Sequence, residues 1–82
     1  MPTSVVTLTS TWTEVQVGPA DSVAIQAGSR RVRYRVNTST PAADASGHVL
    51  SPAVGHTVRL ESGENLYARS DVNLTTSVTV TV

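Results

Sequence analysis

The sequence predicts an all-β protein, a small antiparallel β-sandwich or barrel of about seven short strands without significant helix. The clearest sign is residues 31–36, Arg-Val-Arg-Tyr-Arg-Val, where charged and apolar side chains alternate without a break. Successive side chains of a strand point to opposite faces, whereas a helix with 3.6 residues per turn would mix the two kinds. The apolar set should face a core and the charged set, which we call the arginine comb, should face outward: Val32, Tyr34 and Val36 against Arg31, Arg33 and Arg35.

Two further observations support the same class. Valine and threonine dominate the chain, and both are stiff at χ1 and favour pleated surfaces over helices. No segment has a convincing helical period, and turn signals recur at regular spacing, which is typical of a sandwich or small barrel. The other expected strands are residues 4–9, 12–17, 22–27, 48–50, 56–61, 66–70 and 74–82.

The turns suggest how these strands pair. Gly28-Ser29 fits a tight hairpin, with glycine supplying a positive φ, so residues 22–27 should pair antiparallel with the arginine comb strand. The last three strands should form a meander. Residues 74–82 would then be a long, uncharged edge strand, which invites pairing with another chain. Residues 37–47 form the longest loop and should be irregular, and either mobile or docked on a neighbour.

Composition restricts the function. The 82 residues form one domain, residues 1–82, with zero formal net charge, which argues against a specific nucleic-acid partner. There is no cysteine, so neither a disulfide framework nor a thiolate site is expected. No apolar run approaches the roughly 20 residues that span a bilayer, and the N-terminus lacks signal-peptide features. We therefore expect no membrane association and a cytosol-like compartment, or a particle assembled there.

No motif predicts catalysis or a cofactor. His48 and His56, with Asp44 nearby, do not have the ligand number or spacing of a metal site. No nucleophile elbow, carboxylate pair or glycine-rich phosphate loop is evident. The expectation is a non-enzymatic protein without cofactor or metal, in which Trp12 anchors a core or rim.

The arginine comb leaves two interpretations. It is either a solvated face paired with carboxylates such as Glu14 or Glu61, or a surface that binds an anionic protein. Under the second interpretation the partner-binding residues are those of the comb and of the exposed edge strand: Arg31, Arg33, Arg35, Thr79 and Thr81.

Short motifs spread from Thr11 to Val82 add a family resemblance. They are Thr11-Trp12-Thr13-Glu14-Val15, Val23-Ala24-Ile25-Gln26, Pro41-Ala42-Ala43-Asp44, Gly47-His48-Val49-Leu50 and Asn65-Leu66-Tyr67-Ala68-Arg69-Ser70. Together they resemble small all-β virion structural proteins of tailed bacteriophages. The resemblance carries no catalytic residues.

The resemblance implies a capsid decoration, or cement, protein that binds the outer surface of the major capsid shell. The alternative is a tail-associated or fibre module that contacts a host glycan. The partner would be the major capsid protein or another virion protein, with a homo-oligomer also open. The location would be the virion, assembled in the bacterial host cytoplasm.

Overall fold

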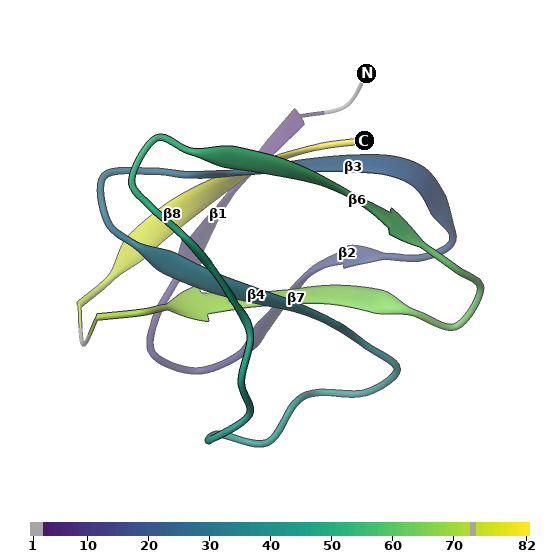
Figure 1. The fold of residues 1–82 in the computed structure, drawn as a ribbon, viewed down its shortest axis with the longest axis horizontal. Helices are drawn as coiled ribbons and strands as arrows, with labels where there is room; N and C mark the ends of the chain where they lie inside the picture. The colour runs from purple at the N-terminus through teal and green to yellow at the C-terminus, as the bar shows by residue number, and fades with distance from the viewer. Residues whose placement is uncertain (1–2, 73) are drawn as a thin grey trace.

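The computed structural model of the chain describes residues 3–72 and 74–82 and confirms the all-β class. These residues form eight strands, and no helix is present among them, so none that could cross a membrane (Figure 1). The strands are β1 (Thr3–Leu8), β2 (Thr13–Val17), β3 (Ala20–Ala27), β4 (Val32–Asn37), β5 (His48–Leu50), β6 (Gly55–Leu60), β7 (Asn65–Ser70) and β8 (Thr76–Thr81).

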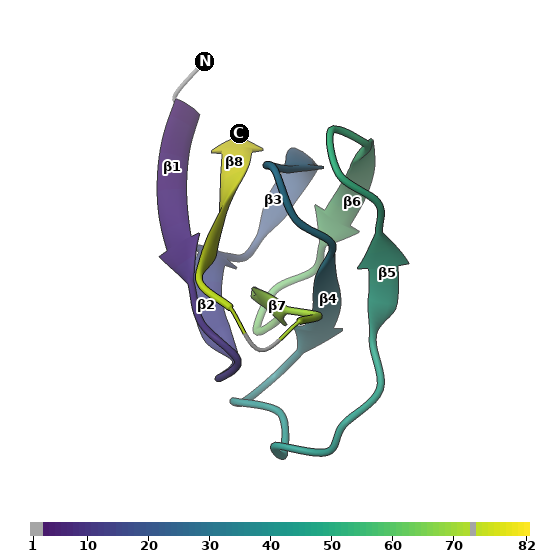
Figure 2. The same cartoon turned by 90° about the vertical axis from the view of Figure 1, so that its left-hand side faces the viewer.

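The strands form two four-stranded antiparallel sheets. One sheet has the order β1-β8-β3-β6 and the other the order β2-β7-β4-β5. In Figure 2 the edge strands β1 and β2 lie along one side of the molecule, and β6 and β5 along the other. Both sheets therefore have their edges on the same two sides, as in a sandwich.

The core lies between the sheets, where the predicted alternation is confirmed. Alternation along four of the expected strands, residues 22–27, 31–36, 56–61 and 74–82, puts nine apolar side chains inside. Seven of them are buried: Val23, Ile25, Val32, Tyr34, Leu60, Val78 and Val80. Val36 and Val58 are half-buried and pack against the same cluster. Arg33 and Arg35 point to the opposite face of β4, because side chains in a strand alternate.

The expected hairpin between residues 22–27 and the arginine comb is wrong. β3 pairs with β6 and β8, whereas β4 pairs with β5 and β7 in the other sheet. Gly28 does not have a positive φ. It is needed instead for a close approach, since its N–H donates to the Ser77 carbonyl at 3.0 Å and a Cβ would lie 2.9 Å from that oxygen.

The expected C-terminal meander and edge strand are also wrong. β6 and β8 lie in one sheet and β7 in the other. β8 is an interior strand, because β1 from the far end of the chain covers its outer side. Thr79 lies opposite Val5 and Gln26, and Thr81 opposite Thr3 and Ala24, so neither threonine lies on a free backbone edge.

Replacing Tyr34 by alanine should lower the free energy of unfolding by about 3–5 kcal/mol, because the residue is only 6% exposed. Tyr34→Phe is the matched control. It keeps the ring and loses only the hydroxyl, so its cost should be about 0.5–1.5 kcal/mol. Urea unfolding followed by circular dichroism measures both. Equal costs for the two variants would show that the ring contributes little to the core.

Candidate functional site: the arginine face

Five of the chain's arginines lie on β4 and β7 or directly before β4. They are Arg30, Arg31, Arg33, Arg35 and Arg69. The register places Arg33 opposite Arg69 and Arg35 opposite Tyr67, on the outer face of this sheet. We call this surface the arginine face. It concentrates positive charge on one side of a chain whose formal net charge is zero.

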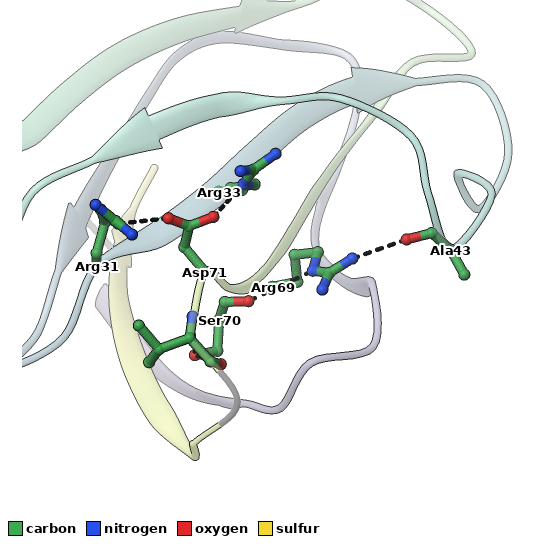
Figure 3. Close-up of polar contacts among 7 residues, drawn as sticks. Arg31, Arg33, Ala43, Arg69, Ser70 and Asp71 are labelled. Carbon is green, nitrogen blue, oxygen red and sulfur yellow. Dashed lines mark hydrogen bonds and ion pairs between the residues drawn. The ribbon is translucent and has the colours of Figure 1, made fainter.

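One carboxylate joins two members of the arginine comb. The Nε atoms of Arg31 and Arg33 contact the two different oxygens of Asp71 (Figure 3). The Asp71 side chain is 6% exposed, whereas those of Arg31 and Arg33 are 53% and 39% exposed. The Asp71 N–H also donates to the Arg31 carbonyl at 3.0 Å. The group therefore has a shielded negative centre with two half-exposed guanidinium groups around it.

Asp71 is a partner that the sequence interpretation missed. Glu14 and Glu61 were the expected carboxylates, but Glu61 pairs with Arg59 on β6, at 3.3 Å. Val32 lies opposite Ser70, so the preceding Arg31 and the following Asp71 face one another where β4 and β7 begin and end. The contact between Arg31 and Asp71 can be predicted only when β4 is known to pair with β7.

The pKa of Asp71 lies below its ordinary value. Burial raises the pKa, but the hydrogen bond and charge of Arg33, together with those of Arg31, lower it by more. The carboxylate is therefore ionised at neutral pH. Two guanidinium charges against one carboxylate leave this group with a net positive charge.

Two further arginines of the face, Arg35 and Arg69, hold the long loop. Residues 38–47 contain neither helix nor strand, which confirms the expected irregular structure. Arg35 donates to the Ser46 carbonyl at 2.9 Å. Arg69 donates to the Ala43 carbonyl at 2.8 Å, as Figure 3 shows. The loop is thus docked on its own sheet. Arg35 already donates a hydrogen bond within the chain.

Trp12 lies between the loop and the arginine face. It is 5% exposed, and the Arg69 guanidinium lies 5.8 Å from the centre of its ring, within cation–π range. A Cβ on Gly47 would approach the indole Cη2 to 2.9 Å, so glycine is what allows the loop to lie this close. The expected role of Trp12 as an anchor is confirmed.

The two histidines converge on Tyr34, which their spacing in the sequence did not indicate. The Tyr34 hydroxyl and His56 Nδ1 share a hydrogen bond of 2.9 Å across the two sheets, and the His48 ring centre lies 5.2 Å from that of Tyr34. Burial raises the pKa of Tyr34, so its phenol stays protonated at neutral pH. An open hollow of about 430 Å³ lies beside Tyr34 and His48.

This cluster lacks the ligands of a metal centre. Among residues 3–72 and 74–82, no group of three His, Cys, Asp or Glu side chains is placed to hold a metal ion. A phenol and two imidazoles instead lie together at the side of the sandwich where β5 and β6 form the edges.

Comparison with known proteins assigns the chain to no family. The chain matches no protein-family model, no curated protein and no solved structure.

Asp71→Asn should lower the free energy of unfolding at pH 7 by about 1–2 kcal/mol, because it removes charge-assisted bonds to two partly solvated arginines. The folded-state pKa of Asp71 is depressed, so its contribution is fully present above the unfolded-state pKa and is lost as pH falls through the folded-state value. Denaturant titrations at several pH values between neutral and acidic measure the difference between wild type and variant. That difference should shrink toward acid pH; a constant difference would contradict the ion pairing.

Arg69→Ala should release the loop without unfolding the domain. Trp12 is the chain's single tryptophan, so its fluorescence reports how well the loop shields the indole ring from solvent. We expect stronger acrylamide quenching of Trp12 and faster amide exchange at Ala45, whose N–H donates to Ala42 within the loop. Arg59→Ala, on the other sheet, is the control and should leave both signals unchanged. Unaltered quenching in Arg69→Ala would mean that the loop is held by other contacts.

Proposed function

We propose that this chain is a non-enzymatic phage virion structural protein, specifically a capsid decoration protein that binds the outer surface of the major capsid shell. The resemblance of its motifs to small all-β virion proteins supports the class of protein. The observation that carries the proposal is the group of Arg31 and Arg33 around Asp71, with its excess positive charge and two half-exposed guanidinium groups. Such a surface fits carboxylates on a partner protein.

The geometry of this group suits protein recognition. Guanidinium groups bind carboxylates in flat, two-pronged contacts, and holding them in place beforehand reduces the side-chain entropy lost on binding. Asp71 holds Arg31 and Arg33 in this way while leaving much of each side chain accessible. Because the chain has zero formal net charge, the face attracts a specific acidic patch rather than any polyanion.

A decoration protein stabilises a shell by burying surface across neighbouring subunits. A sandwich with a loop docked on its own sheet provides a rigid body for this task. In this proposal the arginine face contacts acidic groups of the major capsid protein, and the burial of surface around it adds resistance to internal pressure.

The alternative, a tail or fibre module that binds a host glycan, requires exposed aromatic rings for stacking. The chain's three aromatic side chains are all buried: Trp12, Tyr34 and Tyr67. No feature of the described residues favours this alternative over a protein partner.

The test is to add purified variants to particles stripped of the native chain and to measure occupancy. Arg31→Gln should reduce occupancy several-fold at low salt and less at high salt, because it removes a charge that meets partner carboxylates. The fold should persist, since Arg33 keeps Asp71 paired. Arg59→Gln, a similarly exposed arginine on the other sheet, is the matched control and should bind like wild type.

Equal occupancy of both variants and wild type at every salt concentration would contradict a role for the arginine face. The number of copies bound per saturated particle tests the location separately. Hundreds of copies indicate the shell, whereas a few to a few dozen indicate the tail and would contradict the decoration role.

A further inference from the structure

The sandwich has four edge strands, and three of them carry features that hinder pairing with another chain. β5 has only three residues. β6 carries Arg59 and His56. β2 carries Glu14 and a β-bulge between Glu14 and Gln16. Short length, charge and bulges are the usual means by which natural sheets protect their edges.

The fourth edge, β1, has none of these features. Its sequence, Thr-Ser-Val-Val-Thr-Leu, contains no charge, proline or glycine. It pairs with β8 along its whole length without a register shift, from Thr3 opposite Thr81 to Leu8 opposite Thr76. The backbone on its other side faces outward at the rim of the molecule (Figure 2). A regular, uncharged strand of this kind is a template for a further strand.

The outer face of β1 adds a second feature. Val5 is 70% exposed, more than any other large hydrophobic residue described in the structure. Leu8 is buried and Val6 packs against the core, so the alternation puts Thr3, Val5 and Thr7 on the outer face. The edge therefore presents apolar and β-branched side chains that would contact the side chains of a paired strand on the same face.

We propose that β1 pairs antiparallel with β1 of a second copy of this chain, so that the two four-stranded sheets become one continuous sheet. A twofold axis perpendicular to the sheet keeps opposite residues on the same face. Centred on Val5, this register places Val5 opposite its own copy, Thr3 opposite Thr7 and Ser4 opposite Val6.

Three features favour a second copy as the occupant. The register matches valine with valine and threonine with threonine on the outer face, which are favourable cross-strand pairs. The Thr3–Leu8 strand brings no like charges together, and neither does β8 behind it. The arginine face lies on the other sheet, so pairing through β1 leaves it free for the capsid contact proposed above. The β1 contact thus extends beyond the proposed function and does not depend on it.

Cysteine cross-linking tests the partner and the register together, because the natural chain has no cysteine. Opposite residues of an antiparallel pair have Cα atoms about 4.5–5.5 Å apart, which suits a disulfide. Val5→Cys should therefore form a disulfide-linked dimer rapidly under mild oxidation. Thr3→Cys should not, because two copies of residue 3 would lie about 13 Å apart at four residue steps. Val17→Cys, 55% exposed on β2, controls for random collision.

Sedimentation velocity over a concentration series measures the association of the natural chain. We expect a concentration-dependent dimer that Val5→Lys abolishes, because two like charges would meet at the axis. Val17→Lys, an equivalent change on another edge, should leave the dimer intact. Circular dichroism should show both variants folded, since both positions are exposed.

Equal cross-linking rates for the three cysteine variants would overturn the proposal, as would a natural chain that stays monomeric at millimolar concentration. A chain that is monomeric alone but loses particle binding on Val5→Lys would also overturn it. That result would assign the β1 edge to a strand of the partner protein instead of a second copy.

Discussion

The register of β4 against β7 is the constraint on which the rest of the arginine face depends. Because side chains alternate along a strand, a slip of one residue would turn the arginines into the core and Tyr34 out of it. The observed register places Tyr34 opposite Ala68, a small residue that leaves room for the ring between the sheets. The same register sets Arg33 beside Arg69 and brings Asp71 to Arg31.

Placing several arginines on one sheet face creates repulsion, and the structure relieves it in two ways. Asp71 lies between Arg31 and Arg33 and supplies a nearly buried negative charge. Arg35 and Arg69 direct their guanidinium groups to loop carbonyls, which accept hydrogen bonds without adding charge. The loop carbonyls thus help to offset the repulsion between the arginines. The same hydrogen bonds hold this long irregular segment in place.

Local patterns were enough to predict most of the strands and, where apolar and polar residues alternate, most of the side chains that they bury. In β7 alternation fails, because Leu66, Tyr67 and Ala68 are buried in succession. In residues 31–36 and 76–81, the alternation alone assigns the faces correctly. Pairing between strands could not be predicted in this way, because it depends on contacts far apart in the sequence. β3 ends at Ala27 and β4 begins soon after, at Val32, yet the two strands lie in different sheets. β8 pairs with β1, which comes from the opposite terminus. Asp71 and the convergence of His48 and His56 on Tyr34 were missed for the same reason.

The position of the free edge follows from this topology. An uncharged, β-branched sequence near each terminus could form either an edge or an interior strand, since the two kinds have the same local composition. β8 is protected because β1 and β3 pair with both its sides, and β1 then becomes the edge that lacks protection. Because that edge belongs to the sheet opposite the arginine face, the fold keeps its two accessible surfaces apart. A contact at one of them can therefore form without disturbing the ion pairs that shape the other.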